Sequence, residues 1–178
     1  MKNLENIFFG YENDFERKLD FTLCLVGDNI NELPEKPGIY CVYIGKRLES
    51  KNNEILFQCG MCIYIGESSN VKERALEHQN SRDLLKRLRE VKESVREDEV
   101  LGYTFAYFDE EEEIRKRVQA ALINWHKPKC NKEYMDNFPF PETVIKITGK
   151  AKGFLSETVD IEEPGLDIGE PGFSERKY

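Results

Sequence analysis

The sequence has no long apolar run, and it is poor in cysteine and histidine. It contains no stretch of about eighteen apolar residues that could span a membrane, and its first residues lack the apolar core of a signal peptide. Its five cysteines are an odd number for a disulfide framework. The lone C-x-x-C pair, Cys59 and Cys62, lacks the further ligands of a structural zinc site. These absences predict a cytoplasmic protein with reduced thiols and no membrane partner.

Positive charge is scarce as well. The chain has 26 lysines and arginines against 34 aspartates and glutamates, which gives a formal net charge of −8. Non-specific attraction to the phosphates of DNA depends on positive charge, so this balance excludes DNA binding through bulk charge. Any contact with DNA must therefore use a local basic face.

The chain does have enough apolar material for a core. Its 178 residues, 39% hydrophobic and 34% charged, suffice for one compact domain with modest extensions. Alternating or β-branched segments predict strands at 21–25, 38–44, 55–65, 101–107 and 143–148. Helical spacing of apolar residues predicts helices at 70–79 and 84–95 and from Asp109 to Pro128. This order predicts a small α/β protein.

Two of the predicted helices carry start signals. Asn70 is followed three residues later by Glu73, which is the spacing of a capping box. Asp109 is a candidate cap for the last helix, and the glutamates after it suit the positive end of the helix dipole. Pro128 ends that helix because proline cannot continue it.

Two tripeptides stand on neighbouring predicted strands. Gly38-Ile39-Tyr40 opens the first strand, and Tyr64-Ile65-Gly66 closes the second. Arg74 follows eight positions after the second tripeptide, and His78 comes four positions later, on the same face of the predicted helix. The last predicted helix ends shortly before Asn131.

In this ordered set the chain resembles the GIY-YIG nuclease superfamily, over about Pro37 to Asn131. The resemblance implies an α/β (α+β) fold: a small domain with a short, central, mainly antiparallel sheet flanked by helices. It also implies a one-metal site that hydrolyses phosphodiester bonds of DNA, with Mg²⁺ as cofactor and Mn²⁺ as a substitute. Tyr43-Ile44-Gly45 is a second Tyr-Ile-Gly triplet, but no helix with an arginine follows it at the right distance.

The resemblance implies a role for each matched residue. Tyr40 and Tyr64 would activate water and order the site, with Tyr40 often favoured as the base. A free tyrosine has a pKa of about 10, so a metal ion and Arg74 would have to lower it. The planar guanidinium of Arg74 suits a phosphate, and His78 would relay a proton or contact the phosphate. Asn131 would brace the site by hydrogen bonds.

Each of these residues also has an ordinary structural interpretation. Strand tyrosines commonly fill a core, and a helix arginine or histidine commonly faces solvent. An asparagine after a helix commonly lies in a turn. Lys127, Lys129 and Lys132 form a local basic patch, which together with Lys72 is predicted to contact the DNA backbone.

The match fails at the metal ligand. The family has a glutamate in the last helix, three positions before a Leu-Ile pair, and this chain has Gln119 there. A neutral amide binds Mg²⁺ more weakly than a carboxylate does. Glu112 lies two turns earlier on the same helix face, about 10 Å away, which is too far to substitute.

Two explanations for Gln119 stay open at this point: an engineered change from glutamate, or a natural departure from the family pattern. The leading hypothesis is a metal-dependent DNA endonuclease, present in a catalytically attenuated form. The alternative is a DNA-binding or assembly module that uses the same fold and does not cut.

The chain divides into four predicted regions. Residues 1–36 form an N-terminal extension with a short helix or arm and a strand, and 37–131 form the GIY-YIG-type core. Residues 132–155 form a C-terminal extension. Residues 156–178 are acidic and rich in glycine and proline, which predicts a flexible tail, with a loop packed on the domain as the alternative. The flanking regions are expected to set specificity, because the core mainly supplies chemistry.

Overall fold

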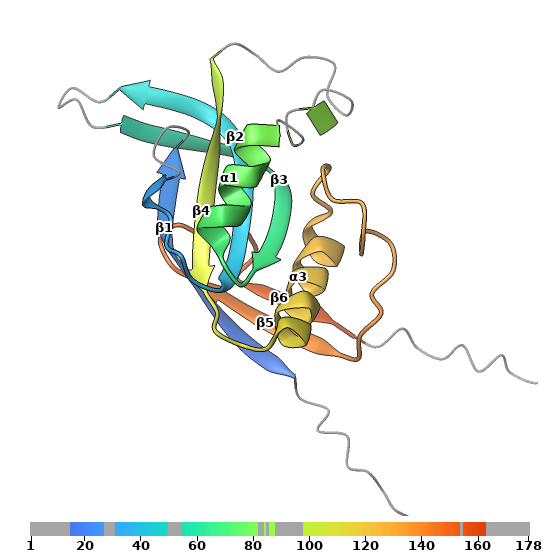
Figure 1. The fold of residues 1–178 in the computed structure, drawn as a ribbon. Coiled ribbons are helices and arrows are strands. Elements are labelled where there is room, and N and C mark those ends of the chain that lie inside the picture. The colour runs from blue at the N-terminus through green and yellow to red at the C-terminus, as the bar shows by residue number, and fades with distance from the viewer. Residues whose placement is uncertain are drawn as a thin grey trace, which may run out of the picture.

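The computed structural model describes residues 15–26, 31–49, 55–81, 84, 86–87, 98–153 and 155–162. In this part the protein is mixed α/β, with one curled six-stranded sheet and two helices (Figure 1). The strands are β1 (Glu16–Val26), β2 (Gly38–Glu49), β3 (Ile55–Ser68), β4 (Glu99–Tyr107), β5 (Thr143–Thr148) and β6 (Thr158–Ile161). The helices are α1 (Val71–Ser81) and α3 (Glu112–His126). Neither described helix is long and apolar enough to cross a membrane.

The sheet is larger than the sequence predicts. Its strand order is β3-β2-β4-β1-β5-β6. Neighbouring strands are antiparallel except β1 and β5, which run parallel with Glu16 opposite Val144. The prediction of a short sheet is therefore wrong, because strands on both sides of 37–131 join the same sheet. Pairing between segments so far apart leaves no signal in local periodicity.

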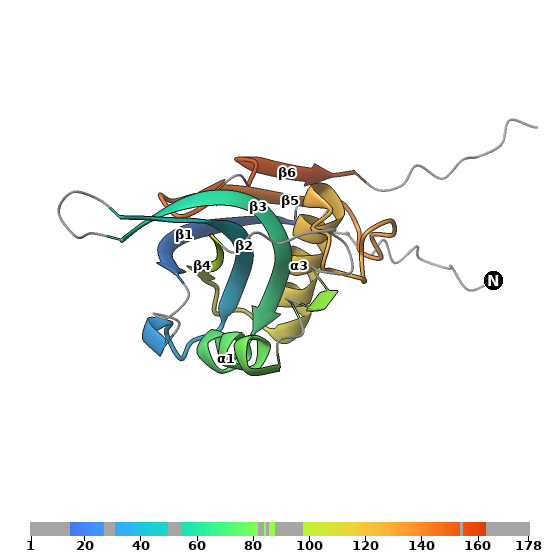
Figure 2. The ribbon, with the colours of Figure 1, turned by 90° about the horizontal axis from the view of Figure 1, so that it is seen from above.

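Successive side chains of β2 feed two separate cores. Ile39, Cys41 and Tyr43 are fully buried in the cluster that contains the apolar face of α3. Tyr40 and Val42 are buried in the other cluster, which contains Val71 and Ala75 of α1. Since neighbouring strand residues point to opposite faces, α1 and α3 cover opposite faces of the sheet. Strand β3 lies between the two helices (Figures 1 and 2).

Helix α1 begins where the sequence predicts. The Asn70 side-chain oxygen accepts a hydrogen bond from the Glu73 backbone N–H at 3.3 Å. The Asn70 N–H donates to the Ser68 hydroxyl at 3.0 Å, so Ser68 makes the contact that a capping box assigns to Glu73. The predicted second helix, 84–95, lies mostly outside the described residues.

The predicted cap of the last helix is wrong. Helix α3 begins at Glu112, and the residue before it makes no side-chain cap hydrogen bond. The Asp109 carboxylate instead accepts a hydrogen bond from the Tyr107 hydroxyl at 2.9 Å. At the other end Lys127 takes a left-handed conformation, with φ of 50°, and its N–H donates to the Ile123 carbonyl. This geometry ends the helix just before Pro128.

The prediction of a flexible tail over residues 156–178 is wrong for the first residues of that segment. Thr158–Ile161 form β6, which pairs with β5, and Val159 is fully buried in the core cluster that includes α3. Its neighbours Thr158 and Asp160 are exposed. A four-residue strand with one buried apolar side chain is too short for periodicity to reveal. Residues 163–178 lie outside the described part.

A chain that ends at Leu155 should be less stable than a chain that ends at Glu162. It loses the buried Val159 side chain and the strand pairing of β5. Burial of one valine contributes about 2 kcal/mol, and at roughly 2–4 °C per kcal/mol the melting temperature should fall by about 5 °C. Thermal denaturation of both chains measures this difference. Equal melting temperatures would show that β6 adds no stability.

Candidate active site at the edge of β3

Strand β3 is an edge strand, and a later segment completes its hydrogen bonding. The Cys130 N–H donates to the Ile63 carbonyl at 2.8 Å. The Asn131 side chain then bonds both backbone groups of Ile65, accepting from its N–H and donating to its carbonyl, each at 2.9 Å. The side-chain amide thus takes the place of a neighbouring strand, which protects an otherwise unpaired edge.

Replacing Asn131 by alanine should destabilise the protein. The variant leaves the Ile65 N–H without this partner, while the Ile65 carbonyl keeps its bond from Gln119, and an unsatisfied group of this kind costs about 1–3 kcal/mol. The Asn131→Asp variant keeps the acceptor for the Ile65 N–H but places a carboxylate oxygen against its carbonyl. Both variants should therefore melt below the unaltered protein, by about 2–4 °C per kcal/mol. Unchanged melting of Asn131→Ala would show that this clamp is dispensable.

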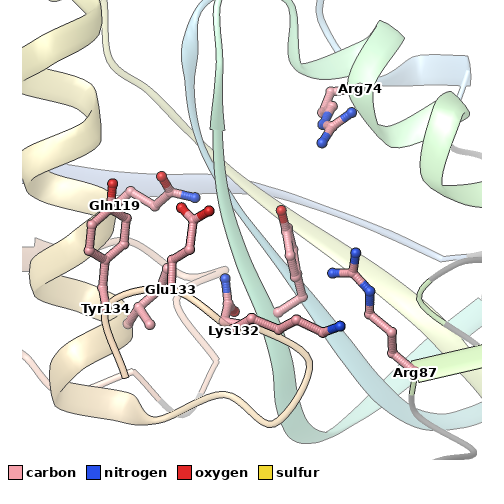
Figure 3. A pocket seen from close by; sticks show the side chains of 9 residues that line it. Arg74, Arg87, Gln119, Lys132, Glu133 and Tyr134 are labelled. Atoms are coloured by element: carbon pink, nitrogen blue, oxygen red, sulfur yellow. The ribbon is translucent and has the colours of Figure 1, made fainter. Parts of the chain in front are cut away.

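A cavity of about 290 Å³ opens at this edge (Figure 3). We call it the edge cavity, and its lining residues are Tyr64, Arg74, Arg87, Gln119, Ile123, Asn131, Lys132, Glu133 and Tyr134. An adjoining hollow of about 460 Å³ also contains Tyr64, Arg74, Gln119, Glu133 and Tyr134 in its lining. Because β3 is an edge strand, side chains from both faces of the sheet reach the same cavity. Arg74 of α1 and Gln119 of α3 meet in this way.

The edge cavity is positively charged in a chain that is acidic as a whole. Arg74, Arg87 and Lys132 line it against one carboxylate, that of Glu133. The Arg87 guanidinium donates to the Cys130 carbonyl at 3.4 Å, beside the segment that covers β3. These side chains give the acidic chain a local basic face at the edge of β3.

The two predicted tyrosines do not lie equally near the edge cavity. Tyr64 lines it and is half-buried, whereas Tyr40 is buried at 1% exposure and does not line it. The two ring centroids are 6.0 Å apart. Burial raises the pKa of Tyr40 well above its usual value of about 10, and the Tyr64 hydroxyl adds to the rise. Arg74 lowers this pKa, as predicted, but burial outweighs it, so Tyr40 stays neutral near pH 7.

His78 lies behind the tyrosines. Its Nε2 is 2.9 Å from the Tyr40 hydroxyl, and its ring centroid is 5.0 Å from that of Tyr64. The imidazole is 9% exposed and lines neither the edge cavity nor the adjoining hollow. The contact with the Tyr40 hydroxyl is the one that a proton transfer through Tyr40 would use.

The glycines of the two tripeptides have a packing reason. A Cβ at Gly66 would overlap the Tyr40 ring, which lies across this position on the neighbouring strand. A Cβ at Gly38 would overlap the Ala106 carbonyl of β4 and the Phe105 ring. Glycine at position 66 therefore leaves room on β3 for the Tyr40 ring, and glycine at position 38 allows the close approach of β4.

Arg74 projects from α1 toward the cavity (Figure 3). One of its guanidinium nitrogens donates to the Glu77 carboxylate at 2.6 Å, on the exposed side of the helix. The Glu77 carboxylate raises the pKa of Arg74 above its usual value, and the two tyrosines add to this. The guanidinium therefore stays charged, and a phosphate would share it with Glu77.

The four predicted DNA-binding lysines are spread over the surface. Lys132 lines the edge cavity. Lys72 is bound to Glu35 at 3.0 Å, and Lys127 lies 4.0 Å from Asp136. Lys129 is exposed, and like Lys72 and Lys127 it does not line the edge cavity. These three positions could touch only DNA that extends beyond the cavity.

A buried ion pair fixes α3 against β3. The Arg115 guanidinium donates to the Glu67 carboxylate at 2.9 Å, and the two side chains are 9% and 15% exposed. Arg115 also donates to the Glu110 carbonyl at the start of the helix. Gln119 lies one turn further along, and its Nε2 donates to the Ile65 carbonyl at 3.3 Å. The hydrogen bonds of Arg115 and Gln119 thereby fix the position of α3 along β3 next to the cavity.

Gln119 alone does not fit the metal that the resemblance implies. Its amide nitrogen is bound to Ile65, and its oxygen is a neutral ligand. No group of three or more His, Cys, Asp or Glu side chains that could hold a metal occurs among the described residues. A Mg²⁺ ion needs only one or two carboxylates when water and phosphate complete its shell. The edge cavity does offer one, that of Glu133.

Sequence patterns did not identify Arg87, Glu133 or Tyr134 as site residues. Glu133 and Tyr134 directly follow Asn131 and Lys132, so proximity to the predicted asparagine was the one available signal. Tyr134 adopts a left-handed backbone with φ of 62°, which is rare for a tyrosine and has no sequence signature here. This turn brings both side chains to the cavity.

Comparison with protein-family models, with curated proteins and with solved structures found no match for this chain.

Proposed function

We propose that this protein is a metal-dependent DNA endonuclease that hydrolyses phosphodiester bonds at the edge cavity. The observation that carries the proposal is the meeting of Tyr64, Arg74, Gln119 and Asn131 in one positively charged cavity. These residues come from separate segments of the chain. Tyr64, Arg74 and Asn131 are among the positions through which the sequence resembles the GIY-YIG nucleases, and Gln119 stands where that family has its metal-binding glutamate. A structural role for each alone would not require them to line the same space.

The geometry supports a distinct role for each group. Arg74 would bind the scissile phosphate with its planar fork of donors. Tyr64 is the tyrosine that lines the cavity and would orient the attacking water. Tyr40 and His78 do not line the cavity and would be positioning residues: His78 contacts the Tyr40 hydroxyl, and Tyr40 interacts with Tyr64 and Arg74. A bound Mg²⁺ ion would polarise the phosphate and lower the pKa of water.

The basic side chains would hold the rest of the DNA. Lys132 and Arg87 line the cavity and are placed to contact phosphates next to the cleaved bond. Lys72, Lys127 and Lys129 would contact the backbone further away. Such contacts release counterions, so DNA affinity is expected to fall as salt concentration rises.

Cleavage of a DNA duplex by the full chain tests the proposal, in Mg²⁺, in Mn²⁺ and with a chelator. We expect cleavage with either ion and none with the chelator. The Tyr64→Phe variant is the control for contaminating nucleases, because a contaminant would cut equally in both preparations.

The neutral amide at Gln119 favours a second candidate, a DNA-binding module that does not cut. Salt-sensitive DNA binding without cleavage at saturating Mg²⁺ and Mn²⁺ would establish this second function. A chain that neither binds nor cuts DNA would contradict both.

A further inference from the structure

We propose that the edge cavity binds one unpaired nucleotide of a DNA strand, with the phosphate at its cationic side and the base stacked on Tyr134. This inference rests on the proposed function, because it names the form of DNA that the site takes. Cations line the cavity on one side and an aromatic ring lines it on the other (Figure 3). A nucleotide has the same two parts, an anionic phosphate and an aromatic base.

The cationic side fixes where the phosphate lies. Figure 3 shows the Lys132 side chain reaching toward Arg87, with Arg74 of α1 on the same side of the cavity. Glu133 and Tyr134 lie opposite, next to α3. Among the described residues that line the cavity, Glu133 is the one acidic side chain, and its carboxylate repels a phosphate. The three cations therefore hold the phosphate, and the space beside Tyr134 takes an uncharged group.

The cavity is larger than a phosphate requires. A phosphate ion occupies roughly 60 Å³, twice the volume share of a water molecule, whereas the cavity holds about 290 Å³. Pockets for small organic ligands begin at about 300 Å³, and the adjoining hollow, which Tyr134 also lines, adds further space. The volume therefore fits a phosphate together with its sugar and base.

Tyr134 has the features of a stacking platform. Its backbone is left-handed, with φ of 62°, a conformation that is rare for an aromatic residue and that persists only where the surrounding structure imposes it. The Asn124 side chain holds this turn by donating to the Tyr134 carbonyl at 3.1 Å. The Tyr134 side chain packs against the core cluster that includes α3, and it also lines the cavity. The ring is therefore held in place before a base arrives, which lowers the entropic cost of stacking.

Stacking on Tyr134 requires a base that is not enclosed in a duplex. Neighbouring bases cover both faces of each base in a duplex, so a protein ring reaches them only when the nucleotide is extruded. Single strands leave these faces free, and aromatic side chains bind them with little dependence on sequence. The site is therefore expected to prefer single-stranded or branched DNA to a continuous duplex.

Fluorescence anisotropy of a labelled single strand tests this inference, with the full chain and a chelator that prevents cleavage. The unaltered chain should bind the strand about tenfold more tightly than the corresponding blunt duplex. Tyr134→Leu should weaken binding of the strand by about tenfold, because stacking is lost, and should leave duplex binding within about twofold. Tyr134→Phe keeps the ring and should bind as the unaltered chain does. The matched control is Tyr107→Leu, which removes an exposed tyrosine that does not line the cavity and should bind normally.

Competition with small ligands gives a second readout that needs no variant. A deoxynucleoside monophosphate should displace the labelled strand at a concentration about tenfold below that of inorganic phosphate, because it adds the stacked base. Equal potency of the two ligands, or equal affinity of the unaltered chain for strand and duplex, would overturn the inference. A Tyr134→Leu protein that melts like the parent and binds the strand equally well would also overturn it.

None of these measurements depends on cleavage. A preference for the single strand that requires the Tyr134 ring, in a chain that never cuts DNA, would support this inference and overturn only the nuclease proposal. Cleavage of DNA by a chain that binds strand and duplex equally would overturn only this inference.

Discussion

Replacing Arg74 by alanine should lower the rate of DNA cleavage by about a hundredfold or more. Arg74 is the cation that α1 contributes to the edge cavity, next to Tyr64. A cation placed where charge develops on a phosphate typically contributes about 10²–10³ in rate. The side chain is about half exposed, so its removal should change the melting temperature little. Single-turnover cleavage and thermal denaturation of the same samples separate the two effects.

Two neighbours on α1 provide matched controls for Arg74. Lys72→Ala removes a cation that is bound to Glu35 and does not line the cavity, so it should lower DNA affinity modestly and leave the cleavage step unchanged. Glu77→Gln removes the carboxylate that competes with phosphate for Arg74, so DNA affinity should be kept or increased. An Arg74→Ala protein that is folded and cuts at the parent rate would show that the phosphate is bound elsewhere.

Changing Gln119 to glutamate should raise the cleavage rate by about tenfold or more at limiting Mg²⁺. The variant adds a second carboxylate to a cavity whose lining has three cations and one carboxylate. One or two carboxylates are the usual protein contribution to a Mg²⁺ site, and a second one strengthens the hold on the ion. The concentration of Mg²⁺ that gives half-maximal cleavage should fall in parallel. Cleavage rates measured across a Mg²⁺ titration test both statements.

The same change should cost a little stability. The Gln119 amide donates to the Ile65 carbonyl, and a carboxylate at this position cannot. The carbonyl keeps its bond from Asn131, so the loss should be about 1 kcal/mol. Gln119→Met is the control, since it removes the same hydrogen bond without adding charge, and it should not raise the rate. Equal rates for Gln119→Glu and the unaltered chain at all Mg²⁺ concentrations would contradict the role of this position in metal binding.

Local signals predicted the elements whose causes are local. Asn70 marks the start of α1 because its side chain caps the helix, and the continuous apolar run of β2 follows from burial on both faces. The pairing of β1 with β5 was not predictable in this way, because it depends on contacts between the two ends of the described chain. Asp109 misled for a different, local reason: the Tyr107 hydroxyl, two residues earlier, engages its carboxylate.

The site was predictable where the spacing of the motif residues grouped them in the sequence. Tyr64 and Arg74 could be grouped from sequence, and they do line one cavity. Tyr40 and His78 could be grouped too, but their burial depends on packing between β2 and α1, which residue spacing does not report. The position of Glu133 depends on the left-handed turn at Tyr134, a conformation that the tertiary structure imposes.

The parallel pairing of β1 with β5 has a consequence for how the protein folds as it is synthesised. Asp20 of β1 and Thr148 of β5 are hydrogen-bonded although they are 128 residues apart. Strand β1 leaves the ribosome well before β5, so one of its edges has no partner until residues 143–148 have also emerged. Contacts between residues so far apart in the sequence slow folding, and an unpaired strand edge is open to association with other chains. We therefore expect refolding to be slow and its yield to fall as protein concentration rises.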